Sequence, residues 1–134
     1  MKHSSVLLAS SEIEPYVRQF HIFGHGIANG VPEDVHLQRM LKETEGQMGL
    51  LVSENSEPVA LATLVPGIVE DSHFPGAGLI CVYLAGRLGV SGVRYLHRCL
   101  RQLAADNGGS WYCISSRVST YEYRNRYYMI GEHP

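Results

Sequence analysis

The chain has 134 residues, which is enough for one domain with a single buried core. Hydrophobic residues make up 45% of the sequence and charged residues 18%, and this balance excludes an intrinsically disordered chain. The formal net charge of −2 argues against a general nucleic-acid binder, because such a protein needs a broad basic surface.

Compartment and redox state follow from the apolar runs and the cysteines. No apolar run approaches the length of a membrane span, and the apolar patch near the N-terminus is too short for a secretory signal. We therefore expect a cytoplasmic protein. Cys81, Cys99 and Cys113 are widely spaced in apolar segments, so we expect them to be reduced and buried rather than bound to a metal or paired in disulfides.

The first quarter of the chain predicts a strand followed by a helix. Residues 4–9 form a short apolar segment that suits a strand. Apolar residues then recur at helical spacing, which predicts a helix over about 12–23. Ser11 and Glu14 have the spacing of a capping box at its start.

A second helix and a hairpin come next. The helix begins at Pro32, with acidic residues in its first turn, and Gly46 ends it. Residues 48–55 and 57–69 are then expected to form two strands joined by a polar turn around Asn55–Ser56. Their apolar character indicates that both faces are covered.

The most apolar segment is residues 79–85, which lies between two glycines and reads as a buried strand. We expect this strand to be central in a sheet and paired with residues 59–65. A loop over residues 69–78 precedes it and is framed by Pro66, Gly67, Pro75 and Gly76, and a loop of this length is often functional.

A glycine-rich turn joins the central strand to an amphipathic helix over residues 93–106. Gly86, Gly89 and Gly92 recur at three-residue intervals, and Ser91 is a candidate N-cap. A strand, a glycine-rich turn and a helix N-terminus together form a common anion cradle. The alternative is that the glycines only permit a tight turn and close strand–helix contact.

The C-terminal part predicts one more strand over residues 110–116 and a last helix over residues 119–131. Tyr123, Tyr127 and Ile130 would lie on one face of that helix. The resulting fold class is α/β, a mixed sheet flanked by helices with the element order β-α-α-β-β-β-α-β-α.

This order resembles the GNAT-type N-acetyltransferase family over nearly the whole chain. The GRLGVSG turn at residues 86–92 is similar to the family's Arg/Gln-x-x-Gly-x-Gly/Ala turn, which holds the pyrophosphate of acetyl-coenzyme A. The strand that follows the helix splays from the central strand in the family, and the pantetheine arm lies in the gap. The ending from Tyr127 to Gly131 is similar to the family's Tyr-x-x-x-Gly, whose Tyr protonates the leaving thiolate.

The resemblance implies N-acetyl transfer from acetyl-coenzyme A to a small-molecule or protein amine. Tyr127 would be the general acid, and packing among other aromatic residues is its alternative role. The cofactor would contact the turn at Gly86, Arg87, Gly89, Ser91 and Gly92. The turn departs from the family pattern in both registers: one places Gly86 at the Arg/Gln position, and the other places Val90 at the middle glycine.

A second hypothesis keeps the fold without the catalysis. The chain resembles the short, degenerate GNAT-like proteins that are found in bacteriophages, some of which are virion components. Such a chain would act as a building block in an assembly, the virion. This hypothesis expects Tyr83 or Trp111 to fill the gap between the splayed strands. It also expects the chain to stop where the family's substrate-side strands begin, which would leave an unpaired sheet edge.

Several other polar residues have both a functional and an ordinary interpretation. Glu70 and Asp71 are candidate bases acting through water, or solvated loop residues. The histidine set suggests zinc by spacing but lacks an obvious third ligand, so surface histidines are the alternative; it comprises His21, His25 and His36.

Two basic groups complete the set of candidates. The long helix carries a basic stripe that is either a solvated face or a contact for phosphates or an acidic partner; it comprises Arg94, His97, Arg98 and Arg101. The C-terminal segment mixes arginines and tyrosines, a composition that suits base stacking or a protein interface. With a net charge of −2 we favour an interface to a protein partner or a second copy; its residues are Arg117, Tyr121, Tyr123, Arg124, Arg126, Tyr127 and Tyr128.

Overall fold

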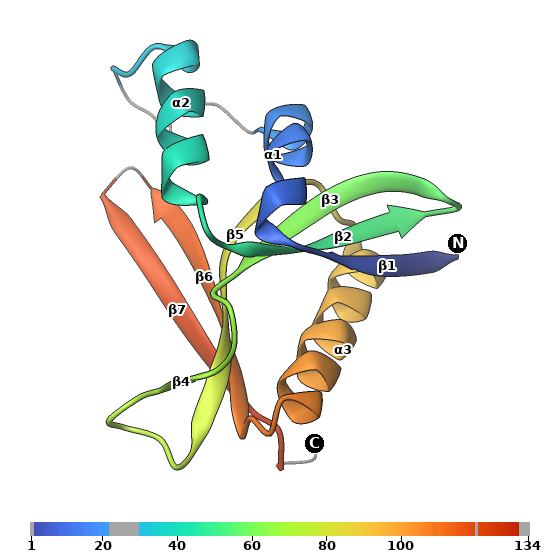
Figure 1. The fold of residues 1–134 in the computed structure, drawn as a ribbon, viewed down its shortest axis with the longest axis vertical. Helices are drawn as coiled ribbons and strands as arrows, with labels where there is room; N and C mark the ends of the chain where they lie inside the picture. The colour runs from blue at the N-terminus through green and yellow to red at the C-terminus, as the bar shows by residue number, and fades with distance from the viewer. Residues whose placement is uncertain (1, 22–29, 120, 132–134) are drawn as a thin grey trace.

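The computed structural model describes residues 2–21, 30–119 and 121–131, and its architecture is a mixed sheet with helices on both faces (Figure 1). The elements in chain order are β1 (His3–Leu8), η1 (Ser10–Glu12), α1 (Glu14–Phe20), α2 (Glu33–Glu43), β2 (Met48–Glu54), β3 (Glu57–Leu64), β4 (Val69–Glu70), β5 (Ala77–Gly86), α3 (Val90–Asp106), β6 (Trp111–Ser119) and β7 (Glu122–Met129). None of the helices in these described ranges is long and apolar enough to cross a membrane.

The seven-stranded sheet has the order β1-β2-β3-β5-β6-β7, and the short β4 pairs with β5. Neighbouring strands are antiparallel except for β5 and β6, which are parallel. The long helix α3 makes the crossover between those two strands. The expected α/β fold class is confirmed, and so is the pairing of the central strand with residues 59–65, because Ala60 pairs with Gly86 and Thr63 pairs with Tyr83.

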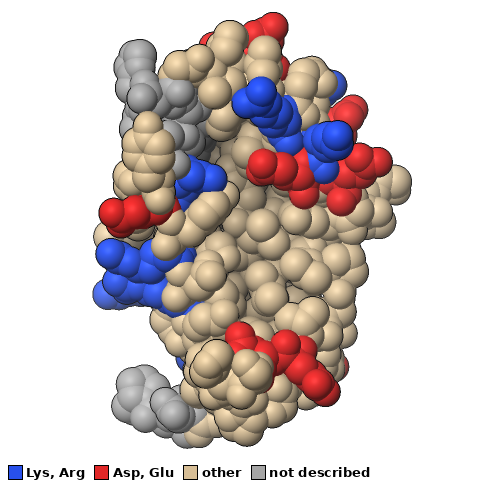
Figure 2. Space-filling model, turned by 90° about the vertical axis from the view of Figure 1, so that its left-hand side faces the viewer, with Lys and Arg blue, Asp and Glu red and all other residues tan. Residues whose placement is uncertain are grey.

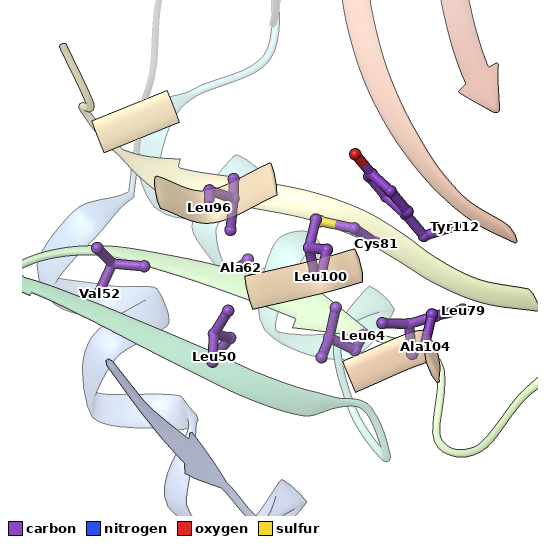
Figure 3. Close-up of a cluster of buried hydrophobic side chains, with 10 residues drawn as sticks. All are labelled: Leu50, Val52, Ala62, Leu64, Leu79, Cys81, Leu96, Leu100, Ala104 and Tyr112. Atoms are coloured by element: carbon purple, nitrogen blue, oxygen red, sulfur yellow. The ribbon is translucent and has the colours of Figure 1, made fainter. Parts of the chain in front are cut away.

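Helix α3 covers one face of the sheet through the apolar stripe that its sequence predicts. Leu96, Leu100 and Ala104 are buried at successive helical turns, and they pack on apolar residues of the central strands (Figure 3). The sheet contributes Leu50, Val52, Ala62, Leu64, Leu79, Cys81 and Tyr112 to this cluster.

Helices α1 and α2 lie over the opposite face (Figure 1). Ile13 and Val17 from the α1 segment are buried against Leu51, Leu61 and Ala85 of the sheet. The start of this helical segment differs from the expected capping box. The N–H of Ala9 donates to the Glu12 carboxylate at 2.8 Å, so the pair sits two residues earlier than Ser11 and Glu14.

The predicted C-terminal helix is wrong, because residues 122–129 form strand β7. β7 pairs antiparallel with β6 along its length, from Trp111 opposite Met129 to Ser119 opposite Glu122. The aromatic and arginine-rich sequence is well suited to a strand, where large side chains pack across the pleated surface. The sheet therefore continues past β6, and its outer edge at this end is β7.

Candidate functional site

Strands β5 and β6 separate partway along their length. Their parallel ladder runs from the Gly78–Trp111 pair to the Cys81–Ile114 pair, although β5 continues to Gly86 and β6 to Ser119. Figure 1 shows the two strands moving apart toward their C-terminal ends. We call the place where pairing stops, at Cys81, Val82 and Ile114, the divergence point.

A β-bulge in β5 coincides with the divergence point. Thr63 pairs with Tyr83 while Leu64 pairs with Cys81, so Val82 is an extra residue in β5. The bulge changes the side-chain alternation, because Cys81 belongs to the core under α3 whereas Tyr83 and Ala85 pack on the α1 side. Bulges leave backbone groups out of the ladder and often occur beside active sites.

At the end of β5 the chain makes the glycine-rich turn of residues 86–92, which we call the α3 turn. Gly86 has a φ of +94°, and a Cβ there would lie 2.3 Å from the carbonyl oxygen of Val59. Gly92 is buried, and a Cβ would meet the Leu88 side chain at 3.0 Å. These two glycines are therefore explained by the fold itself.

Gly89 has no such steric explanation. It is the N-cap of α3, its φ is −76°, and a Cβ would meet nothing within 4 Å. Gly89 has no side chain to cap the N-terminus of this helix, and the first N–H···O bond of its first turn runs from Val93 to the Gly89 carbonyl at 2.9 Å. The N–H groups of residues 90–92 thus precede the helical bonds and are free to bind an anion.

Ser91 lies inside the first turn of α3, so its predicted role as N-cap is wrong. It is nevertheless exposed at the helix N-terminus, as are Arg87 and Arg94. No acidic residue occurs in the sequence between Asp71 and Asp106. The helix dipole and both arginines attract a negatively charged ligand to the α3 turn. An opposing charge nearby is Glu54, whose carboxylate lies 3.3 Å from Nε2 of His3, and this ring packs beside Gly92.

Tyr127 lies on strand β7, beside the part of β5 and β6 that is still paired. It pairs with Cys113, which in turn pairs with Ile80. Gly86 is six residues farther along β5, so Tyr127 and the α3 turn are separated by roughly 20 Å at about 3.3 Å per residue. The structure thus brings the five turn residues together and places Tyr127 at the other end of the splayed segment.

Two aromatic rings, Phe74 and Trp111, lie against this tyrosine, and we call the three residues together the floor cluster. Ring centroids are 4.6 Å apart for Phe74 and Tyr127, and 5.4 Å apart for Trp111 and Tyr127. Trp111 is completely buried and fits over Gly78, where any Cβ would collide with the indole at 2.0 Å. The loop before β5 supplies Phe74, so this loop folds across the paired half of β5 and β6.

The same loop brings a carboxylate to Tyr127. The phenol hydroxyl donates to Asp71 Oδ2 at 3.4 Å, and the N–H of His73 donates to Asp71 Oδ1 at 2.8 Å. The His73 backbone N–H is the main cause that lowers the pKa of Asp71, and the Tyr127 hydroxyl adds to it. Burial, followed by the proximity of Cys113 and Asp71, raises the pKa of Tyr127. At neutral pH the site therefore pairs a charged carboxylate with a protonated phenol.

The cysteines near the divergence point are not nucleophiles. Cys81 and Cys113 are free and buried, as predicted, and Cys99 is free and half-buried. Burial raises the pKa of Cys81 to about 12 and also raises that of Cys113. Both thiols therefore stay protonated at neutral pH.

The histidines do not form a metal centre in the part of the chain that is described. His21 Nε2 lies 2.6 Å from His36 Nδ1, but no group of three potential ligands occurs in residues 2–21, 30–119 and 121–131. His25 lies outside those residues.

The basic stripe on α3 is partly used in packing. His97 Nδ1 lies 2.8 Å from the Tyr112 hydroxyl, and the Arg101 guanidinium lies over the Tyr112 ring and donates to the Ile130 carbonyl at 3.2 Å. These two residues dock the β6–β7 hairpin onto the helix. Arg94 and Arg98 are exposed.

Two features of the site were missed from sequence. The floor cluster was missed because Phe74 and Trp111 are far apart in the chain, and only the small residue Gly78 hinted that a large ring lies over β5. The bulge at Val82 was missed because it shows only as a change in alternation within a continuous apolar run.

Comparisons with known proteins bear on the fold. No protein-family model matches this sequence, and no curated protein matches it. Among solved structures, the chain is similar to the aminoglycoside acetyltransferase meta-AAC0020 from an uncultured soil metagenomic sample, crystallised in complex with trehalose. The TM-score is 0.50 at 13% identity, over 87% of this chain and 78% of that one.

The likeness shows that this chain has a GNAT-like acyltransferase fold. The observed sheet, the splayed β5 and β6, and the crossover helix that starts beside their open end agree with it.

Proposed function

We propose that this protein is an acetyl-coenzyme A-dependent N-acetyltransferase that acts on an amine. The coincidence at the divergence point carries the proposal: the β5–β6 ladder ends and β5 bulges within one residue of each other. A non-catalytic scaffold gains nothing from interrupting its central strand on both edges, whereas a thioester between the strands needs unpaired backbone groups.

The α3 turn would hold the cofactor's pyrophosphate. Gly89, Ser91 and Gly92 would contribute backbone N–H groups at the start of α3, and Arg87 would add positive charge. Gly86 would turn the chain at the end of β5 so that those groups come close together. The pantetheine arm would then extend toward the divergence point, which lies in the direction of Tyr127.

The reaction needs positioning and charge stabilisation more than special nucleophiles. The amine lone pair attacks the thioester carbonyl carbon, a C–N bond forms, and the C–S bond breaks. Backbone N–H groups at the bulge would polarise the carbonyl oxygen. Tyr127 would give its proton to the departing thiolate, and the proton lost by the amine would pass to solvent.

The test is direct detection of the product. Purified protein with acetyl-coenzyme A and a primary amine should release free coenzyme A and the N-acetylated amine in equal amounts, measured by mass spectrometry. Absence of both products with a broad amine panel, together with absence of cofactor binding, would rule the proposal out.

A second candidate is a non-catalytic role in an assembly, and the exposed outer edge of β7 favours it. Tyr123 is 61% exposed and Tyr121 is 86% exposed, and the arginine-rich strand has no neighbouring strand on its outer side among the residues that the structure describes. The two rings that this hypothesis assigns to the gap are held elsewhere: Tyr83 packs beneath α1 and Trp111 lies over Gly78. A monomer by light scattering would count against this role.

A further inference from the structure

The carboxylate beside Tyr127 is better suited to holding a cation than to accepting a proton. The Asp71 side chain is 26% exposed, and both its oxygens already accept hydrogen bonds, Oδ1 from the His73 N–H and Oδ2 from the Tyr127 hydroxyl. These bonds stabilise the charged form, so the carboxylate stays ionised well below neutral pH. A weak base of this kind gains little by taking a proton from an amine, but it remains a fixed negative charge.

Aromatic surface lies next to this charge. The Phe74 and Tyr127 rings are 4.6 Å apart, and Tyr127 is 36% exposed, so part of the phenol ring faces solvent beside Asp71. A carboxylate next to an accessible aromatic ring attracts alkylammonium groups through both an ion pair and a cation–π contact.

The floor cluster also has an unsatisfied donor. Trp111 is completely buried, and its indole N–H has no hydrogen-bond partner among the residues that the structure describes. A buried donor without a partner is uncommon in folded proteins and calls for an acceptor from elsewhere. The indole N–H is thus a donor within the floor cluster that an acceptor atom of a bound molecule, and not its ammonium group, would satisfy.

The charges around the site are divided. The α3 turn and the first four turns of α3 contain arginines and no acidic residue, and the acidic residue of the helix, Asp106, lies at its far end. Glu70 lies on β4 and Asp71 directly after it. Figure 2 shows acidic side chains at the lower end of the face that carries β4, an uncharged area in its middle, and both basic and acidic side chains along its left side and at its upper end. An anionic cofactor and a cationic acceptor would be drawn to different ends of the same site.

On the basis of the proposed function, we infer that the acceptor is a dicationic amine, a short diamine or polyamine. One amino group, in its neutral form, reacts at the divergence point. The second stays protonated and is held by the Asp71 carboxylate and the exposed face of Tyr127.

The test compares two acceptors of equal length, 1,4-diaminobutane and 4-aminobutan-1-ol, with acetyl-coenzyme A at saturation. We expect kcat/KM to be about tenfold higher for the diamine, which is the size of one exposed ion pair plus one exposed cation–π contact. The preference should shrink when the ionic strength is raised, because the pair is exposed to solvent.

Two variants locate the effect. Asp71→Asn keeps an oxygen that accepts the His73 N–H but removes the charge, so the diamine preference should fall severalfold. What remains should be the part that comes from the Tyr127 contact and from the statistical factor of about two for two amino groups. Glu70→Gln removes the neighbouring charge on β4 and should lower the preference much less than Asp71→Asn does, because Glu70 would attract the second ammonium group only at long range.

The outcomes separate the inference from the function beneath it. Equal kcat/KM for both acceptors in the wild type would overturn the inference while N-acetyl transfer stands. The same diamine preference in Asp71→Asn as in the wild type would also overturn it. Absence of transfer to either amine, with no acetyl-coenzyme A binding, would remove the proposed function and the inference together.

Discussion

The glycines of the α3 turn illustrate how two identical residues serve different purposes. Gly86 occupies a left-handed conformation against the Val59 carbonyl, while Gly89 has an ordinary conformation with open space around it. A side chain at Gly86 conflicts with the fold, and a side chain at Gly89 conflicts only with a ligand that approaches the helix N-terminus.

This difference predicts that alanine destabilises the fold at Gly86 but not at Gly89. Gly86→Ala should lower the free energy of unfolding by about 2 kcal/mol or more, because it combines left-handed strain with a Cβ 2.3 Å from a carbonyl oxygen. Gly89→Ala should change it by less than about 0.5 kcal/mol. Urea denaturation of both variants measures the two values, and equal losses would contradict the geometry of the turn.

Tyr127 supports a second prediction at the residue scale. If the phenol protonates the leaving thiolate, Tyr127→Phe should reduce kcat by about 100-fold while the KM for acetyl-coenzyme A changes little. Because the pKa of Tyr127 is raised, this phenol stays protonated up to about pH 10. Wild-type kcat should therefore show no loss from tyrosine deprotonation below that pH. Stopped assays across this pH range with both proteins provide the measurement; an unchanged kcat in the variant would limit Tyr127 to packing in the floor cluster.

Among the elements, β7 shows where local pattern is insufficient. Tyr123 and Tyr127 are four residues apart, a spacing that puts them on one face of a helix and equally on one face of a strand. Only Ile130 distinguished the two interpretations, because its distance of three residues from Tyr127 fits one face of a helix but not one face of a strand. The strand forms because β6 offers a full-length partner, with Cys113 opposite Tyr127, and such non-local pairing is not visible in the segment itself.

The docking of the β6–β7 hairpin on α3 predicts a pH dependence of stability. Burial, with Arg101 nearby, lowers the pKa of His97. The unfolded chain binds a proton at this residue near pH 6.5, whereas the folded chain does so only at lower pH. Below pH 6.5 the unfolded state holds more protons, so stability should fall as the pH falls until folded His97 is itself protonated.

Urea midpoints measured between pH 7.5 and 5 test this dependence. His97→Gln should be less stable at pH 7.5, because it loses the ring contacts with Tyr112 and Tyr128, but its midpoint should vary less with pH. The variant will not be fully independent of pH, since burial also lowers the pKa of His21. An unchanged slope would show that His97 is not the residue whose protonation weakens the fold.

For the molecule as a whole, the sequence predicted most of the elements and their order, because amphipathic spacing and turn residues are local signals. The central pairing of residues 79–85 followed from the apolar character of that strand, and α3 from its buried stripe at Leu96, Leu100 and Ala104. The site was less predictable: the five turn residues are contiguous, but the Asp71–Tyr127 contact joins residues 56 positions apart. Such contacts depend on how the loop before β5 folds across the sheet.

The central claim, that an anionic cofactor binds at the N-terminus of α3, is tested most directly by isothermal titration with acetyl-coenzyme A. Gly89→Asp and Gly89→Asn have side chains of nearly equal size, both suit an N-cap, and a Cβ at this position meets no neighbouring atom within 4 Å. We predict measurable binding by the wild type and a dissociation constant at least about tenfold weaker for the Asp variant than for the Asn variant, because only Asp repels the pyrophosphate. No wild-type binding at millimolar cofactor, or equal affinities in the two variants, would contradict the account.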